Sequence, residues 1–160
     1  MPVALNGSTS GSVTITAPAV AGTSTLTLPA VTDTLVALAA TQTLTSKTLT
    51  NPSINDYTEG VTVIGSSGTS QTLSLTAGTV QTVTMTGNCT FTMPTATAGK
   101  SFILIATQDG TGSRTATFTS VKFPNGAAPT LTTTATTGRD ILTFVSDGTN
   151  WYGTIAQAFA

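Results

Sequence analysis

Histidine is absent from this 160-residue chain, and cysteine occurs only once. Without histidine the chain has no classical catalytic triad, no usual general base and few ways to hold a transition metal. A single cysteine, Cys89, excludes an intrachain disulfide framework. Its setting in "NCTFTM" favours a small apolar strand residue over a reactive thiol. We therefore expect no catalytic, metal-binding or cofactor-binding residues.

Charge is also scarce, at 7% of residues against about 25% in a usual soluble domain. The five basic residues are scattered singly and the net charge is −1, which predicts no binding of DNA or RNA. The longest apolar runs, "LVALAA" and "FILIA", are too short to cross a bilayer. The first ten residues lack the pattern of a secretory signal. We expect neither a nucleic-acid partner nor a membrane.

Six carboxylates remain for acid/base chemistry. The only pairs near in sequence are Asp56 with Glu59 and Asp140 with Asp147, and each member has Gly, Asn or Arg beside it. Turn or cap roles are the main interpretation, and a glycosidase-like pair is the alternative. "TAGKS" ends like a phosphate-binding loop, but a strand follows it instead of a helix. The sequence thus predicts a protein that is not an enzyme.

What the chain has instead is threonine, which accounts for forty residues. Threonine suits a pleated strand through its β-branch, and its hydroxyl keeps an outward face wet without charge. The composition therefore predicts an all-β protein. With so little charge to keep copies apart, much of the surface is expected to be covered in an assembly.

The chain divides near residue 56. Residues 1–56 form short, proline-limited phrases that predict strands over about 12–16 and 24–28. Such a segment has too few apolar residues to close a core alone. We interpret it as an N-terminal extended arm that needs partners.

Residues 57–160 predict a self-sufficient domain. Short strands follow one another every eight to fifteen residues, many of them alternating apolar residues with Thr or Ser. This pattern is typical of an antiparallel β-sandwich or jelly roll. "SFILIAT" is apolar on both faces, so it is placed centrally. "DILTFVSDGTNWYGTI" reads as a closing hairpin with an Asp-Gly turn. The predicted core residues are Ile103, Ile105, Ile141, Phe144, Trp151 and Ile155; a ligand-stacking role is the alternative for Trp151.

One stretch, "TQTLTSKTLTNPSI", fits neither element. Its large apolar residues Leu44, Leu49 and Ile54 fall five residues apart, whereas a strand buries every second residue and a helix every third or fourth. A single chain offers no continuous face on which these three residues are buried together.

The phrases "GSVTITAPAVAGTSTLTLPAVTDTLV" and "ATQTLTSKTLTNPSI" resemble a segment of tailed-bacteriophage virion proteins, including capsid decoration proteins, head fibres and tail fibres. The resemblance covers about residues 11–54. It implies a homotrimer with an intertwined β segment that leads into three β-sandwich heads. In that arrangement Leu44, Leu49 and Ile54 become successive layers of a threefold trimer interface.

Two functions follow from the resemblance. The first is a capsid decoration or cement protein that binds the major capsid protein or another virion protein on the outer capsid surface. The short length and low charge favour it. The alternative is a short head or tail fibre that adheres to a host receptor or surface glycan, supported by Trp151 and Tyr152 near a turn.

Overall fold

The computed structural model describes residues 3–6, 9–16, 22–23, 43–44 and 47–159. The chain separates into two units, Met1–Pro52 and Ser53–Ala160, close to the boundary expected after Asp56. In the first unit, β1 (Val3–Asn6) and β2 (Ser12–Ile15) form an antiparallel hairpin. The strand expected over 12–16 is thus present, while the one over 24–28 lies outside the described residues.

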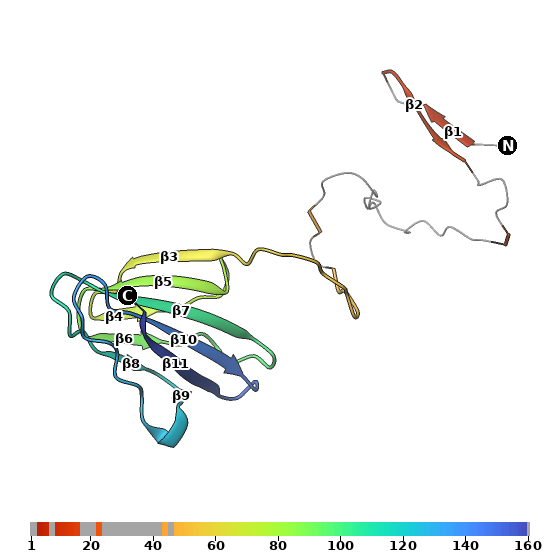
Figure 1. The fold of residues 1–160 in the computed structure, drawn as a ribbon. Coiled ribbons are helices and arrows are strands. Elements are labelled where there is room, and N and C mark those ends of the chain that lie inside the picture. Colours follow the sequence, from red (N-terminus) through yellow and green to blue (C-terminus); the bar gives the residue numbers. More distant parts are fainter. Residues whose placement is uncertain (1–2, 7–8, 17–21, 24–42, 45–46, 160) are drawn as a thin grey trace. The chain divides into compact units, whose positions relative to one another are not determined.

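The second unit is built from strands in two sheets (Figure 1). The six-stranded sheet has the order β3-β5-β7-β10-β11-β9, and the three-stranded sheet has the order β4-β6-β8. The strands are β3 (Val61–Ser66), β4 (Ser70–Thr72), β5 (Val80–Met85), β6 (Cys89–Thr92), β7 (Ser101–Gln108), β8 (Ala116–Phe118), β9 (Val121–Lys122), β10 (Arg139–Ser146) and β11 (Trp151–Phe159); a short 3-10 turn, η1 (Pro124–Gly126), follows β9. The predicted all-β class is confirmed. None of the described residues forms a helix able to span a membrane.

From β3 to β8 the chain alternates between the two sheets, so that it winds as three coils. The pairs β3/β5 and β5/β7 in one sheet and β4/β6 and β6/β8 in the other are all parallel. Parallel neighbours need a crossover, and here the strand in the opposite sheet provides it. The coils stack closely at their corners: a Cβ on Gly87 would lie 2.8 Å from the Gly68 carbonyl oxygen. A side chain at this corner would push the second and first coils apart.

Only the last part of the unit pairs as the sequence predicted. β10 runs antiparallel to β7, and β10 and β11 form the expected closing hairpin. The expectation of antiparallel pairing throughout is wrong for the three coils and also for β9, which runs parallel to β11. Alternation identifies a strand but carries no information about the direction of its neighbour.

The core lies between the two sheets and draws on both. Phe118 on β8 packs 5.4 Å from Phe144 on β10, centroid to centroid, and Phe102 on β7 stacks on Phe144 at 4.8 Å. The buried apolar residues are Leu73, Val83, Met85, Cys89, Phe91, Met93, Phe102, Leu104, Ala106, Ala116, Leu131, Leu142, Phe144 and Trp151. Phe144 and Trp151 therefore lie in the core, and Ile155 packs partly buried against it.

Three predicted core residues lie on the opposite side of the sheet. Ile103 and Ile105 on β7 alternate with the buried residues Phe102, Leu104 and Ala106. Ile141 likewise precedes the buried Leu142 on β10. The assignment of these isoleucines to the core is corrected. Because "SFILIAT" is apolar on both faces, its pattern could not show which face is inside.

Candidate functional site

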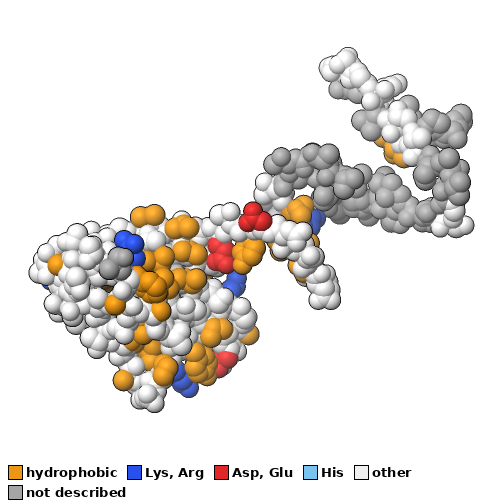
Figure 2. Space-filling model, in the orientation of Figure 1, with side chains coloured by type: hydrophobic (Ala, Val, Ile, Leu, Met, Phe, Trp, Pro, Cys, Tyr) orange, Lys and Arg blue, Asp and Glu red, His pale blue; other side chains and the backbone are white. Residues whose placement is uncertain are grey.

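The candidate site is the face of the six-stranded sheet that points away from the core, called here the outer face. Its large apolar and aromatic side chains come from five neighbouring strands: Val61 and Val63, Val80, Ile103 and Ile105, Ile141 and Val145, and Tyr152 and Phe159. The registers align them in rows, since Val61 lies beside Val80 and Val80 beside Ile103, while Ile105 lies beside Ile141. Figure 2 shows hydrophobic side chains gathered over this sheet.

Strand β3 exposes large apolar side chains, which a strand at a protein surface usually turns inward. It turns Val61 and Val63 outward, and Val63 is 77% exposed. It turns Thr62 inward, and within the described residues the buried Thr62 hydroxyl has no hydrogen-bond partner. A register slip of one residue would reverse both placements. Ile64, on the same inward side as Thr62, packs partly buried against the core, so β3 is apolar on both sides and its outward valines leave apolar surface exposed.

Two shallow hollows lie on the outer face. One, of about 170 Å³, is lined by Glu59, Thr79, Ser101, Phe102, Ile103 and Thr143. The other, of about 90 Å³, is lined by Val63, Gly65, Thr82, Val83, Thr84 and Thr107. The face can therefore accept protruding side chains of a partner.

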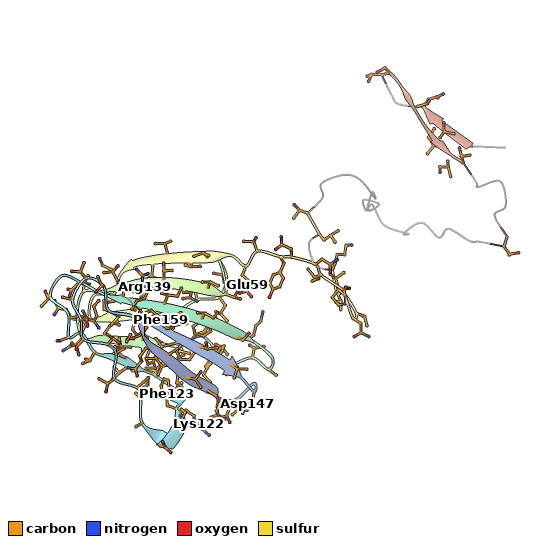
Figure 3. All side chains as sticks on the ribbon, viewed as in Figure 1. Glu59, Lys122, Phe123, Arg139, Asp147 and Phe159 are labelled. Atoms are coloured by element: carbon orange, nitrogen blue, oxygen red, sulfur yellow. The ribbon has the colours of Figure 1, made fainter. Side chains whose placement is uncertain are left out.

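Charge borders this face at its two ends (Figure 3). Glu59 stands just before β3, where its carboxylate accepts hydrogen bonds from the hydroxyls of Thr79 and Tyr57, the latter at 3.3 Å. Arg139 begins β10 at the opposite end and donates through Nε to the Thr107 hydroxyl at 3.2 Å. Within the described residues neither has an ion-pair partner. The rows between them carry only apolar residues, Thr and Ser.

The residues predicted for the trimer interface are exposed in the single chain. Leu49 is 60% exposed, and Leu44 and Ile54 are about as open. Their role in a trimer interface remains a prediction. Val61, Val63 and Val80 were not predicted from the sequence as surface residues, because the alternation in "GVTVIG" indicates a strand but not which of its faces is exposed.

Two of the carboxylates, Asp109 and Asp147, serve turns and loops. Asp147 accepts hydrogen bonds from the backbone amides of Thr149 (2.8 Å) and Asn150 (2.7 Å) and from the Tyr152 hydroxyl (2.9 Å). These bonds, that from Asn150 first, lower the pKa of Asp147 from 3.8 to about 2. Asp109 binds Arg114, whose hydrogen bond lowers the pKa of Asp109. Among the described residues no group of His, Cys, Asp or Glu could hold a metal ion.

Asp147, in the turn between β10 and β11, is expected to make the free energy of unfolding depend on pH. Because the folded-state pKa of Asp147 lies below its ordinary value, the stabilisation is complete above pH about 4 and is lost as the pH falls through about 2. Urea unfolding of the natural chain and of Asp147→Asn at pH 5 and pH 2.5 measures it. The difference between the two proteins should shrink at the lower pH; a constant difference would contradict this.

Three further candidate features are Cys89, a hollow beside β11 and the neighbouring aromatic residues Trp151 and Tyr152. Cys89 is buried, and burial raises the pKa of its thiol, so it is a poor nucleophile. An apolar hollow of about 300 Å³ beside β11 is lined by Phe123, Pro124, Ala127, Pro129, Thr154 and Ile155. Trp151 is 1% exposed, so its ring lies out of reach of a ligand from solvent, whereas its neighbour Tyr152 is 41% exposed.

Comparisons of the chain with protein-family models, with curated proteins and with solved structures found no match.

Proposed function

We propose that this chain is a non-enzymatic structural protein of a tailed-bacteriophage virion. In this proposal it is a homotrimeric capsid decoration or cement protein that binds and stabilises the outer capsid surface. The observation that carries the structural role is the outer face, whose rows of Val and Ile contain no charge between Glu59 and Arg139. The phrases within residues 11–54 support the virion assignment through their resemblance to phage proteins.

The mechanism is association by burial, with no bond made or broken. Residues 57–160 supply a sandwich-like head, and Leu44, Leu49 and Ile54 of three chains form the trimer interface. Burying one Leu or Ile contributes roughly 1.5–3 kcal/mol, so nine such residues give about 14–27 kcal/mol before the cost of ordering the chains. Folding of this segment and trimerisation are therefore coupled.

A charge in this interface is expected to break the trimer. Leu49→Asp would place three carboxylates about one axis, so we expect monomers or aggregates in sedimentation velocity. Thr50→Asp is the matched control, because it adds the same charge beside the apolar layer and should sediment as the natural protein does. A normal trimer of Leu49→Asp would mean that the axis lies elsewhere.

Copy number tests the place in the virion. A cement protein should be present at on the order of hundreds of copies per particle, and particles without it should release DNA at lower temperature. Densitometry of purified virions and a heating series measure both. About a dozen copies per particle would reject the capsid role.

The alternative is a short head or tail fibre that binds a host receptor or surface glycan. The exposed ring of Tyr152, held by Asp147 at 2.9 Å, favours it because a fixed aromatic ring can stack on a sugar. The isolated protein should then block adsorption by occupying the receptor. Unchanged adsorption in saturating protein would reject the fibre.

A further inference from the structure

We propose that the outer faces of neighbouring copies pack against one another, with Glu59 of one copy paired with Arg139 of the next. This inference rests on the homo-oligomer proposed above and does not depend on its place in the virion. It adds a contact surface within residues 53–160 to the interface proposed for Leu44, Leu49 and Ile54.

The chemistry of the face favours another copy of this chain as its partner. An apolar surface without internal charge loses stability if a partner brings an unpaired charge onto it. A second outer face brings none within the rows of β3, β5, β7 and β10 that lie between Glu59 and Arg139, because these rows contain only Val, Ile, Thr, Ser and Gly. At the borders of these four strands the face presents one acid, Glu59, and one base, Arg139, so this part of the face is complementary in charge to itself; Lys122 lies beyond β11, on the edge strand β9.

The two charged residues lie too far apart to pair within one chain. Glu59 precedes β3, while Arg139 lies three strands across the sheet, on β10, and beside Thr107 at the far end of β7. With strands about 4.8 Å apart and about 3.3 Å per residue, the separation is roughly 25 Å. Only a contact between chains can bring them together.

The midpoint between these ends falls near Ile103 and Ile105 on β7. If the symmetry axis of the oligomer passes this midpoint, it brings the Glu59 end of one copy against the Arg139 end of the next copy. In the proposed trimer, each copy would give one end to each neighbour and the isoleucines would surround the axis. This places apolar residues at the centre and charged pairs at the rim, as in specific interfaces.

Charge reversal and its rescue test the pairing. Glu59→Arg and Arg139→Glu, made singly in the full chain, should each raise the dissociation constant of the oligomer about tenfold or more, because like charges then meet. The double variant Glu59→Arg/Arg139→Glu should restore it to within about threefold. Thr92→Glu on β6 adds a charge in the three-stranded sheet, away from the outer face, and is the control that should leave the constant unchanged. Sedimentation equilibrium gives the constants, and circular dichroism checks that each variant is folded.

Cross-linking tests the same contact through the proximity of the two residues and does not depend on a change in affinity. Glu59→Cys/Arg139→Cys should form covalent oligomers with a short bis-maleimide, while Glu59→Cys/Thr92→Cys, with its second thiol in the three-stranded sheet, should not; buried Cys89 is a poor competitor. An oligomer in which neither reversal matters and the Cys pair does not cross-link would overturn this inference alone. A natural chain that sediments as a monomer would overturn the proposed homotrimer as well.

Discussion

Trp151→Ala is expected to lower the free energy of unfolding by about 3–5 kcal/mol. The side chain is 1% exposed and meets Phe102 edge-on, with ring centroids 5.3 Å apart. Its indole Nε1 also donates to the Pro94 carbonyl oxygen at 2.8 Å, which links β11 to the segment after β6. Alanine removes the ring contacts, opens a cavity between the sheets and leaves the partly buried Pro94 carbonyl without this donor.

Urea unfolding followed by far-ultraviolet circular dichroism measures this loss without relying on tryptophan fluorescence. Trp151→Phe is the matched variant: it keeps an aromatic ring but not the donor, so its loss should be clearly smaller. Tyr152→Ala, at the next and exposed position, should cost about 1 kcal/mol or less. A Trp151→Ala protein within about 1 kcal/mol of the natural one would contradict the packing described for β11.

The second large effect is expected at Asp140, which is 1% exposed although it can carry a charge. Its carboxylate accepts from the Thr132 amide and hydroxyl, both at 2.6 Å, and from the Ala158 amide at 3.1 Å. It thereby joins the loop before β10 to the end of β11. Asp140→Ala removes the acceptor of the Thr132 amide and hydroxyl and leaves the Ala158 amide with only the Thr132 hydroxyl oxygen, at 3.0 Å. It should cost about 3–5 kcal/mol, because bonds to charged groups contribute about 1.5–3 kcal/mol each and are not additive.

Asp140→Asn is the control, since its amide oxygen can still accept one of these bonds and its loss should be smaller. Hydrogen exchange gives a local readout: in Asp140→Ala the amides of Thr132 and Ala158 should exchange faster, while those of β5 change less. Equal stability of Asp140→Ala and the natural chain would show that Asp140 does not hold this end of the sheet.

The outer face illustrates how far sequence reasoning reached. The sequence pattern correctly predicted β7 as a central strand that is apolar on both faces. The same pattern led to the wrong placement of Ile103 and Ile105 in the core. Both faces of "SFILIAT" are apolar, and a two-residue period does not indicate which face of the strand is buried. The coils were missed for a similar reason, because strand alternation does not indicate whether the next strand joins the same sheet or the opposite one.

The sequence by itself determined the all-β class, through its forty threonines and alternating segments, and the closing hairpin, through strong strands on either side of "SDGTN". Those signals are local, since each depends on residues a few positions apart. Only the tertiary structure decided the parallel stacking of the coils, the inward face of β7 and the position of Glu59 and Arg139 at opposite ends of one surface. These depend on which strands become neighbours, and contacts between residues distant in the chain determine that choice.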